Sequence, residues 1–180
     1  MKVEDVLTEV LVRLGDIDKY DINNLPQDDD EINTIVKCIN MIISEISSDY
    51  LPLECIEEVQ ITNGIIPYDM LSKKLINLKT ITQNNAKIGA KLYPEAIVCD
   101  VSGNVKVQYL YMPNELKLGD IIELSPKVTL MLLAYGVLGE YCLLQGRYED
   151  SMFYDKRYRE MLKVASRTIK EIKLKHGWWY

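Results

Sequence analysis

The residues whose types could perform catalysis or bind a metal are few and widely spaced. The chain has one histidine, His176, and its four cysteines never form a C-x-x-C pair. Zinc sites and redox pairs use such close spacings, and a Ser–His–Asp or Cys–His arrangement would have to be built on His176 alone. We therefore predict a protein that is not an enzyme, with no catalytic residue, no metal and no cofactor. The cysteines are interpreted as small buried hydrophobic residues: Cys38, Cys55, Cys99 and Cys142.

Carboxylates are the other groups that could do chemistry. The run Asp28-Asp29-Asp30-Glu31 is not followed by the glycine at position six and the glutamate at position twelve that an EF-hand calcium loop requires. Asp28 is instead suited to cap a helix, with Glu31 three residues further on. The glycine-rich phosphate-binding motifs are also absent from the sequence. Carboxylates far apart in the sequence could still meet on folding, so an acid–base pair stays open.

Charge is distributed unevenly along the chain. The net charge is −6, from 21 basic and 27 acidic residues. Residues 1–60 hold 15 acids and 4 bases, whereas residues 156–175 hold 8 bases and 2 acids. The two ends can attract each other within one molecule or between neighbouring copies, and the second case would orient self-association. The acidic total and the lack of a recognition motif argue against sequence-specific nucleic-acid binding.

Three segments have apolar residues three or four positions apart, which is the spacing of a helix with one buried face. A further segment contains the uncharged, almost wholly apolar run 128–139 and is expected to form a helix that is buried on all sides. The predicted helices span residues 3–14, 29–48, 126–145 and 148–173. Ser125 is expected to cap the third helix, with Pro126 in its first turn. Glycine is unfavourable inside a helix, so Gly136 and Gly139 indicate that another backbone approaches closely, unless the two are simply tolerated.

Between residues 53 and 124 the apolar spacing shortens towards two and turn residues become frequent, which predicts strands. Thr62-Asn63-Gly64-Ile65 predicts a hairpin, because Asn-Gly accepts the positive φ of a type I′ turn. A second hairpin is expected between residues 97–101 and 105–112, across Ser102-Gly103-Asn104. The sheet is expected to be small and antiparallel.

These features predict one α+β domain over residues 1–180. It would be an antiparallel bundle of about four helices, with a small antiparallel β insert (residues 53–124) between the second and third helices and an extended C-terminal arm (residues 174–180). The uncharged run 128–139 is too short to span a membrane. The first residues, Met1-Lys2-Val3-Glu4-Asp5, carry acids where a secretory signal carries positive charge, so we expect the protein to stay in the cytoplasm that makes it.

The last residues end in three aromatic side chains, Trp178, Trp179 and Tyr180, after a glycine. Such side chains at a chain end are common anchors in protein interfaces. They could alternatively fold back onto their own domain.

The order helix, helix, strand-rich insert, apolar helix, charged helix and aromatic tail resembles the head-to-tail adaptor (head-completion) proteins of tailed bacteriophages. The resemblance is sharpest over the last third, in Leu133-Ala134-Tyr135, Gly146-Arg147-Tyr148-Glu149-Asp150 and Tyr158-Arg159-Glu160-Met161-Leu162. Trp178 lies where some members of the family carry a tryptophan near the end. Lys175-His176-Gly177 departs from the arginine-rich lead expected before it.

The resemblance implies a structural virion protein at the head–tail junction. Identical subunits would form a ring, usually dodecameric, that joins the portal protein to the tail nozzle or tube and extends the DNA channel, with DNA only as passing cargo. The implied portal-binding residues are Lys173, Lys175, His176, Trp178, Trp179 and Tyr180. The implied tail-facing loops contain Asn84, Asn85, Ser102, Gly103 and Asn104. A tail-completion or tail-terminator ring, or a non-viral cytoplasmic protein-binding module, are the alternatives.

Overall fold

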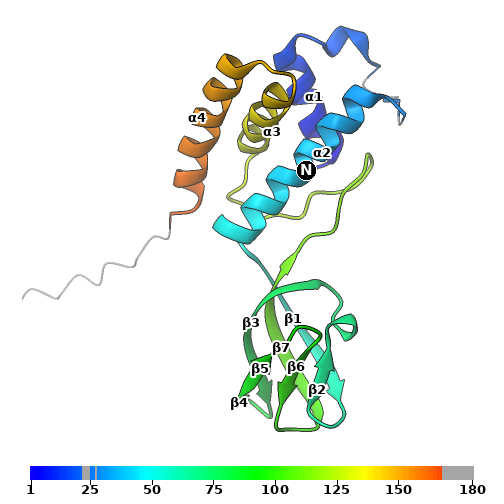
Figure 1. Ribbon diagram of the computed structural model, residues 1–180, viewed down its shortest axis with the longest axis vertical. Coiled ribbons are helices and arrows are strands. Elements are labelled where there is room, and N and C mark those ends of the chain that lie inside the picture. Colours follow the sequence, from blue (N-terminus) through cyan, green and yellow to red (C-terminus); the bar gives the residue numbers. More distant parts are fainter. Residues whose placement is uncertain (22–24, 27, 168–180) are drawn as a thin grey trace, which may run out of the picture.

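The computed structural model describes residues 1–21, 25–26 and 28–167, which form two lobes along one long axis (Figure 1). One lobe is helical and the other is built of strands. In the described residues the helices are α1 (Val3–Leu14), α2 (Asp30–Glu45), α3 (Leu130–Leu144) and α4 (Tyr148–Ala165). The strands are β1 (Leu53–Ile61), β2 (Ile65–Pro67), β3 (Lys74–Gln83), β4 (Ala86–Ile88), β5 (Ala90–Leu92), β6 (Ala96–Cys99) and β7 (Gly103–Met112).

The first two helices form largely as their sequences indicate. α1 buries its apolar stripe, and Gly15, with a φ of 80°, ends it by donating its N–H to the carbonyls of Leu11 and Val12. The N-cap of α2 is Asp29. Asp28 was predicted for this position from the sequence, and that prediction is wrong. The Asp29 carboxylate accepts hydrogen bonds from the N–H groups of the second and third residues after it, at 2.9 and 3.0 Å. A wider helical turn over Ile46–Tyr50 follows α2.

The third helix begins later than its sequence predicts. Thr129 is the cap of α3, because its hydroxyl accepts the N–H of Leu132 at 3.2 Å. The Ser125 hydroxyl accepts the N–H of Lys127 at 3.4 Å, so Ser125-Pro126 forms a turn ahead of the helix. From Leu130 onward most of α3 is buried, and it packs against α1, α2 and α4 as the centre of the helical lobe.

The fourth helix lies antiparallel to α3 and contacts it closely. An added Cβ at Gly139 would lie 3.4 Å from the backbone nitrogen of Asp155 in α4, and one at Gly136 would lie 3.0 Å from side-chain atoms of Ile42 and Tyr158. The close approach of another backbone, predicted at both glycines, is therefore found at Gly139, whereas the atoms closest to Gly136 belong to side chains. α4 ends at Ala165, short of the predicted residue 173, and residues 168–173 lie outside the described residues.

All paired strands in the described chain are antiparallel. One sheet has the order β1-β7-β3-β4 and the other has the order β2-β6-β5. The tight turn at Asn63-Gly64 forms as predicted, with φ values of 59° and 71°, but β1 and β2 continue into different sheets. The second predicted hairpin is wrong: β6 pairs with β2 and β5, whereas β7 pairs with β1 and β3. The alternation of apolar and polar residues along a segment identifies a strand, but it does not specify the strand with which that segment pairs.

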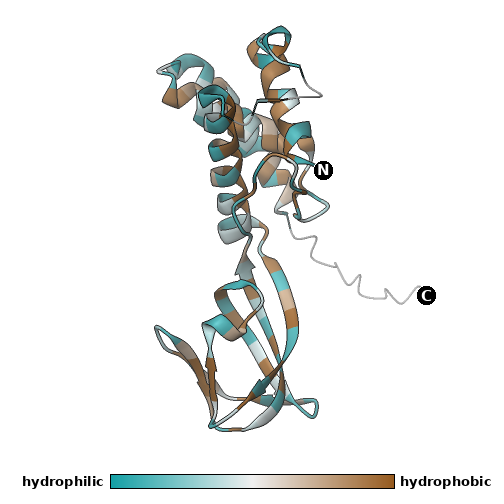
Figure 2. Ribbon diagram, turned by 90° about the vertical axis from the view of Figure 1, so that its right-hand side faces the viewer, coloured by the Kyte–Doolittle hydropathy of each residue, from teal (hydrophilic) through white to brown (hydrophobic). Residues whose placement is uncertain are grey.

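The predicted fold class, a helical bundle with a small β insert, is wrong because the strands make up a lobe of their own and not a small insert. The described strands number seven and form two sheets with a hydrophobic core of their own. That core contains Ile66, Ile81, Ile97, Val107 and Tyr109. Figure 2 shows the two lobes joined by a narrow crossing, with hydrophobic residues in both. The insert is a sizeable sheet lobe because its inward side chains face one another instead of the helices.

A connector of residues 113–129 returns the chain from β7 to α3 and is held at two places. The Asn40 side chain of α2 donates to the carbonyl of Leu116 at 2.9 Å and accepts its N–H at 2.8 Å. The first residues of the chain pair with the connector, since the N–H of Val3 bonds to the carbonyl of Asp120 at 3.1 Å and Ile122 donates to Met1 at 2.9 Å. The connector is thus part of the helical lobe.

Candidate functional site

The cysteines are the strongest potential nucleophiles in the described chain, and burial raises the pKa of two of them. Cys38, Cys99 and Cys142 are buried free thiols, and Cys55 is half-buried. Burial, aided by the Glu140 carboxylate, raises the pKa of the Cys38 thiol to about 11. Burial likewise raises the pKa of the Cys142 thiol. A thiol with a raised pKa is a poor nucleophile at neutral pH.

No group of three or more His, Cys, Asp or Glu side chains that could hold a metal ion occurs in residues 1–21, 25–26 and 28–167. The single histidine, His176, lies outside these residues. Within the same part of the chain, no helix has both the length and the apolar character needed to cross a membrane.

Carboxylates distant in the sequence do meet other groups, and the groups they meet are tyrosine hydroxyls. Glu31 accepts hydrogen bonds from Tyr20 at 2.9 Å and from Tyr141 at 2.8 Å, which links the start of α2 to the end of α3. Burial first, and then the hydrogen bond to Glu31, raise the pKa of both tyrosines. Tyr158 donates to Glu45 at 3.1 Å and links α4 to the far end of α2.

The sheet lobe has a bond of the same kind. The Tyr109 hydroxyl donates to Glu57 at 2.6 Å and accepts the N–H of Lys73 at 3.2 Å. Burial raises the pKa of Tyr109, and its bond to Glu57 raises it further. These tyrosine–carboxylate bonds hold elements together; each carboxylate is occupied by a neutral donor, which is a structural use of the acid.

The sequence-predicted tail-facing loops are brought together at one end of the sheet lobe. In the strand register, Ile61 of β1 is opposite Gly103 of β7, and Thr82 of β3 is opposite Lys106. The turn at Asn84-Asn85 and the segment Ser102–Asn104 are therefore neighbours. The Gln83 side chain bonds to the carbonyl of Ser102 at 3.0 Å across them. A shallow groove of about 230 Å³ lies between the loops, and Asn84, Asn85 and Asn104 line it together with Glu58, Thr82, Val105 and Lys106.

A third loop joins this end of the sheet lobe and was not among the sequence-predicted site residues. The Asn63-Gly64 turn directly follows β1, and Gly64 accepts the N–H of Cys99 at 2.8 Å. Its Asn-Gly pair was visible as a turn signal, but only the register of β1 with β7 places it beside the other two loops. We call the three loops, residues 62–64, 84–85 and 102–104, the polar tip. They present exposed amides and backbone groups that can hydrogen-bond a partner.

The helical lobe carries a second surface, on α4. Only Ser151, Tyr158 and Leu162 of this helix are buried. Large apolar side chains on its other faces are open to solvent: Met152 is 74% exposed, Phe153 56% and Val164 65%. Beside its last turns lies an apolar groove of about 330 Å³, lined by Lys127, Thr129, Leu132, Glu160, Met161, Val164 and Ala165. Exposed apolar side chains beside an apolar groove are more typical of an interaction surface than of the rest of a protein's surface.

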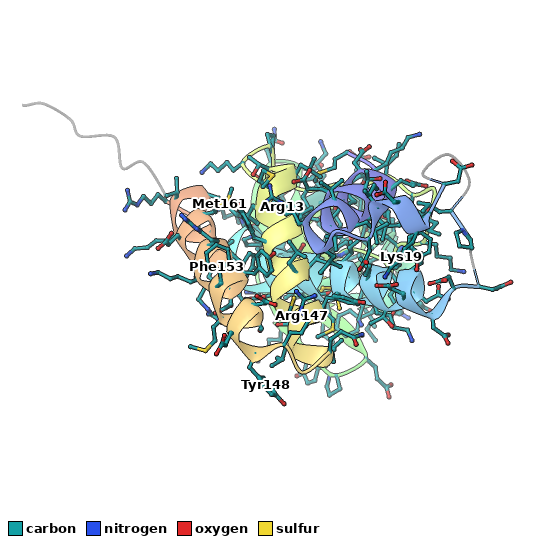
Figure 3. All side chains as sticks on the ribbon, turned by 90° about the horizontal axis from the view of Figure 1, so that it is seen from above. Arg13, Lys19, Arg147, Tyr148, Phe153 and Met161 are labelled. Carbon is teal, nitrogen blue, oxygen red and sulfur yellow. The ribbon has the colours of Figure 1, made fainter. Side chains whose placement is uncertain are left out.

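A ladder of aromatic and guanidinium groups in contact with one another connects α1, α3 and α4; two of its members, Arg13 and Phe153, are labelled in Figure 3. Arg13 lies over the ring of Tyr135 at 5.0 Å, and Tyr135 stacks on Tyr154 at 6.2 Å. Phe153 meets Tyr154 edge-on at 5.4 Å, and Arg157 lies over Phe153 at 5.8 Å. The ladder fixes the direction in which Phe153 and Arg157 point, so this flank of α4 is pre-organised for contact.

The sequence-predicted portal-binding residues, Lys173, Lys175, His176, Trp178, Trp179 and Tyr180, lie outside the described residues, as does the whole predicted arm. α4 precedes them in the chain and ends at Ala165, and the described residues end at Arg167. Their role stays a prediction.

No protein-family model matches the sequence. No curated protein matches it either.

Proposed function

We propose that the protein is a structural component of a tailed-phage virion, a head-to-tail adaptor whose copies form a ring between the portal and the tail. The observation that carries the proposal is the separation of two unpartnered surfaces on two lobes. The polar tip lies at the free end of the sheet lobe, and the exposed faces of α4 lie on the helical lobe. A protein that joins two different partners needs two surfaces of this kind.

The two surfaces also differ in chemistry. The polar tip offers amides and backbone groups, which suits a wet, hydrogen-bonded contact. The α4 surface offers large apolar side chains beside cations, which suits a more permanent contact. In the proposal the tip faces the tail, while α4 and the residues that follow it, including Trp178 and Trp179, face the portal and neighbouring subunits.

The proposal predicts that deleting residues 177–180 abolishes binding to portal-bearing capsids without changing the thermal midpoint. Burial of large aromatic rings at an interface is worth on the order of 2 kcal/mol each. The measurement is co-sedimentation of purified protein with capsids, beside a melting curve for each variant. A matched control replaces Asn84-Asn85 by Asp-Gly, which keeps the turn type. The control is expected to bind capsids normally and to fail in joining tails.

The outcomes separate the alternatives. Unchanged capsid binding by the truncated protein would remove the portal role of the arm, and an early melt would show that the arm belongs to its own fold. A protein that binds tail tubes but not capsids would be a tail-completion ring. A protein that binds neither would be a binding module of another kind, and genes for portal, capsid and terminase beside its own would then be absent.

A further inference from the structure

The outer face of α4 includes cations that form no ion pair with another described residue. From Lys156 to its end at Ala165 this helix has four basic residues and one acid, and Arg167 follows two residues after its end. Arg159 is paired with Asp155 at 2.8 Å, and Arg157 approaches Glu160 only to 3.9 Å. Lys156 and Lys163 have no ion pair among the described residues, and both are exposed. Positions 156, 159 and 163 follow helical spacing, so they share one stripe of the helix.

Acids gather at the opposite end of the helical lobe. We call Asp16–Asp18 and Asp28–Glu31 the acidic end. Lys19 is the neighbouring base, and it is held by Asp16 at 2.6 Å. Asp29 and Glu31 are used inside the molecule, by the helix cap and the tyrosine bonds. Asp18, Asp28 and Asp30 point their charge at solvent, since all three are exposed.

The molecule cannot bring these two surfaces together itself. Tyr158 ties α4 to Glu45, the last residue of α2, whereas the acidic end surrounds the first residue of α2. A helix of 16 residues is about 24 Å long, which is two to three times the screening length of about 8–10 Å in physiological salt. Seen from above, α4 with Phe153 and Met161 lies on one side of the lobe and Lys19 lies on the other (Figure 3).

We infer that the outer face of α4 docks on the acidic end of a second copy of this chain. The cations of α4 then meet Asp18, Asp28 and Asp30 of the neighbour. Apolar contact accompanies the charges: Met152 and Val164 are exposed on α4, and Val12, 51% exposed, lies beside the acidic end in the last turn of α1. Because the two surfaces are different and lie on opposite sides, the contact is head-to-tail and repeats from copy to copy, which closes a ring or extends a filament.

This inference rests on the proposed function only for the biological setting of the ring; the contact itself is a property of the isolated protein. The test is a charge swap followed by sedimentation velocity over a range of concentrations. One variant carries Lys156→Glu and Lys163→Glu, and the other carries Asp18→Lys and Asp28→Lys. Each alone is expected to associate at least tenfold more weakly than the wild type. Mixed in equal amounts, they are expected to associate again, because every contact then pairs opposite charges.

The control variant carries Lys87→Glu and Lys91→Glu, on exposed positions of the sheet lobe, and is expected to associate like the wild type. Raising the salt concentration should weaken wild-type association, which needs no variant and so no assumption about folding. A wild-type protein that stays monomeric, a Lys156→Glu/Lys163→Glu protein that associates normally, or a mixture that fails to re-associate would each overturn the inference. If a variant no longer self-associates but binds capsids normally, the proposed portal role stands and the docking inference is separate from it. If the wild type self-associates as inferred but does not bind capsids, only the docking inference stands.

Discussion

Gly139 provides a sensitive test of how α3 and α4 pack. An added Cβ at this position would lie 3.4 Å from the backbone nitrogen and 3.6 Å from the Cα of Asp155. Alanine therefore just fits, and its helix propensity exceeds that of glycine by about 1 kcal/mol. Leucine places three further carbons against the same backbone, which cannot rotate away as a side chain would. We expect Gly139→Ala to be neutral or to raise stability slightly, and Gly139→Leu to lower it by about 1–3 kcal/mol despite its better propensity.

The assay is urea denaturation followed by far-UV circular dichroism, with the free energy of unfolding taken from the midpoint and slope. Gly136→Ala is the companion variant, because its Cβ would lie only 3.0 Å from both Ile42 and Tyr158. It should lose about 1 kcal/mol where Gly139→Ala does not. A leucine variant with an unchanged or raised midpoint would refute the reasoning, since it would mean that α4 does not rest on α3 at this residue.

Two further expectations concern the sheet lobe and the tyrosine bonds. Gly64→Ala should lower the free energy of unfolding by at least about 2 kcal/mol, since φ is +71° and an added Cβ would clash with the Cys99 carbonyl. Urea denaturation measures this loss, and Gly89→Ala is the neutral control because nothing lies within 4 Å of its added Cβ. Tyr141→Phe removes the 2.8 Å bond to Glu31 and should cost about 1–2 kcal/mol at pH 8. Burial and this bond raise the pKa of Tyr141, so its stabilisation is complete below about pH 10, the ordinary tyrosine pKa, and falls as the pH rises from there towards the raised value. Midpoints measured between pH 8 and 11 should therefore decline less steeply in the phenylalanine variant, and equal slopes would contradict the assignment.

The helices were largely predictable from the sequence because α1 and α2 each bury an apolar stripe along a continuous segment and α3 is apolar over most of its length. The start of α3 could not be predicted from the sequence, because Ser125 and Thr129 are both residue types that cap helices. Only the structure shows which of them accepts a hydrogen bond from an N–H group of the helix. The end of α4 was also missed. Its apolar spacing continues past Ala165, so periodicity alone gives no stop there.

The sheet lobe was underestimated because strand pairing is a long-range property. β1 and β7 are separated by more than forty residues, yet they pair along the whole length of β1. Nothing local in Val105 or Val107 specifies that partner. The polar tip was found in part for the same reason: its turns were recognisable one by one, but the register that gathers them was not. The α4 surface was anticipated as a charge difference, without the exposed Met152 and Val164 that accompany it.

The way the chain enters and leaves the sheet lobe has a consequence for how such a protein can diversify. Leu53, where the chain enters, is paired with Tyr111, next to where it leaves. The sheet lobe is therefore a single insertion into the helical lobe, and the antiparallel pair of β1 and β7 brings its two ends together. Insertions whose ends lie next to each other are well tolerated by protein domains. A different sheet lobe grafted at these two residues would meet the same anchoring geometry. The proposed partner-binding loops at the far end could thus be exchanged together with the sheet lobe while the helices stay as they are.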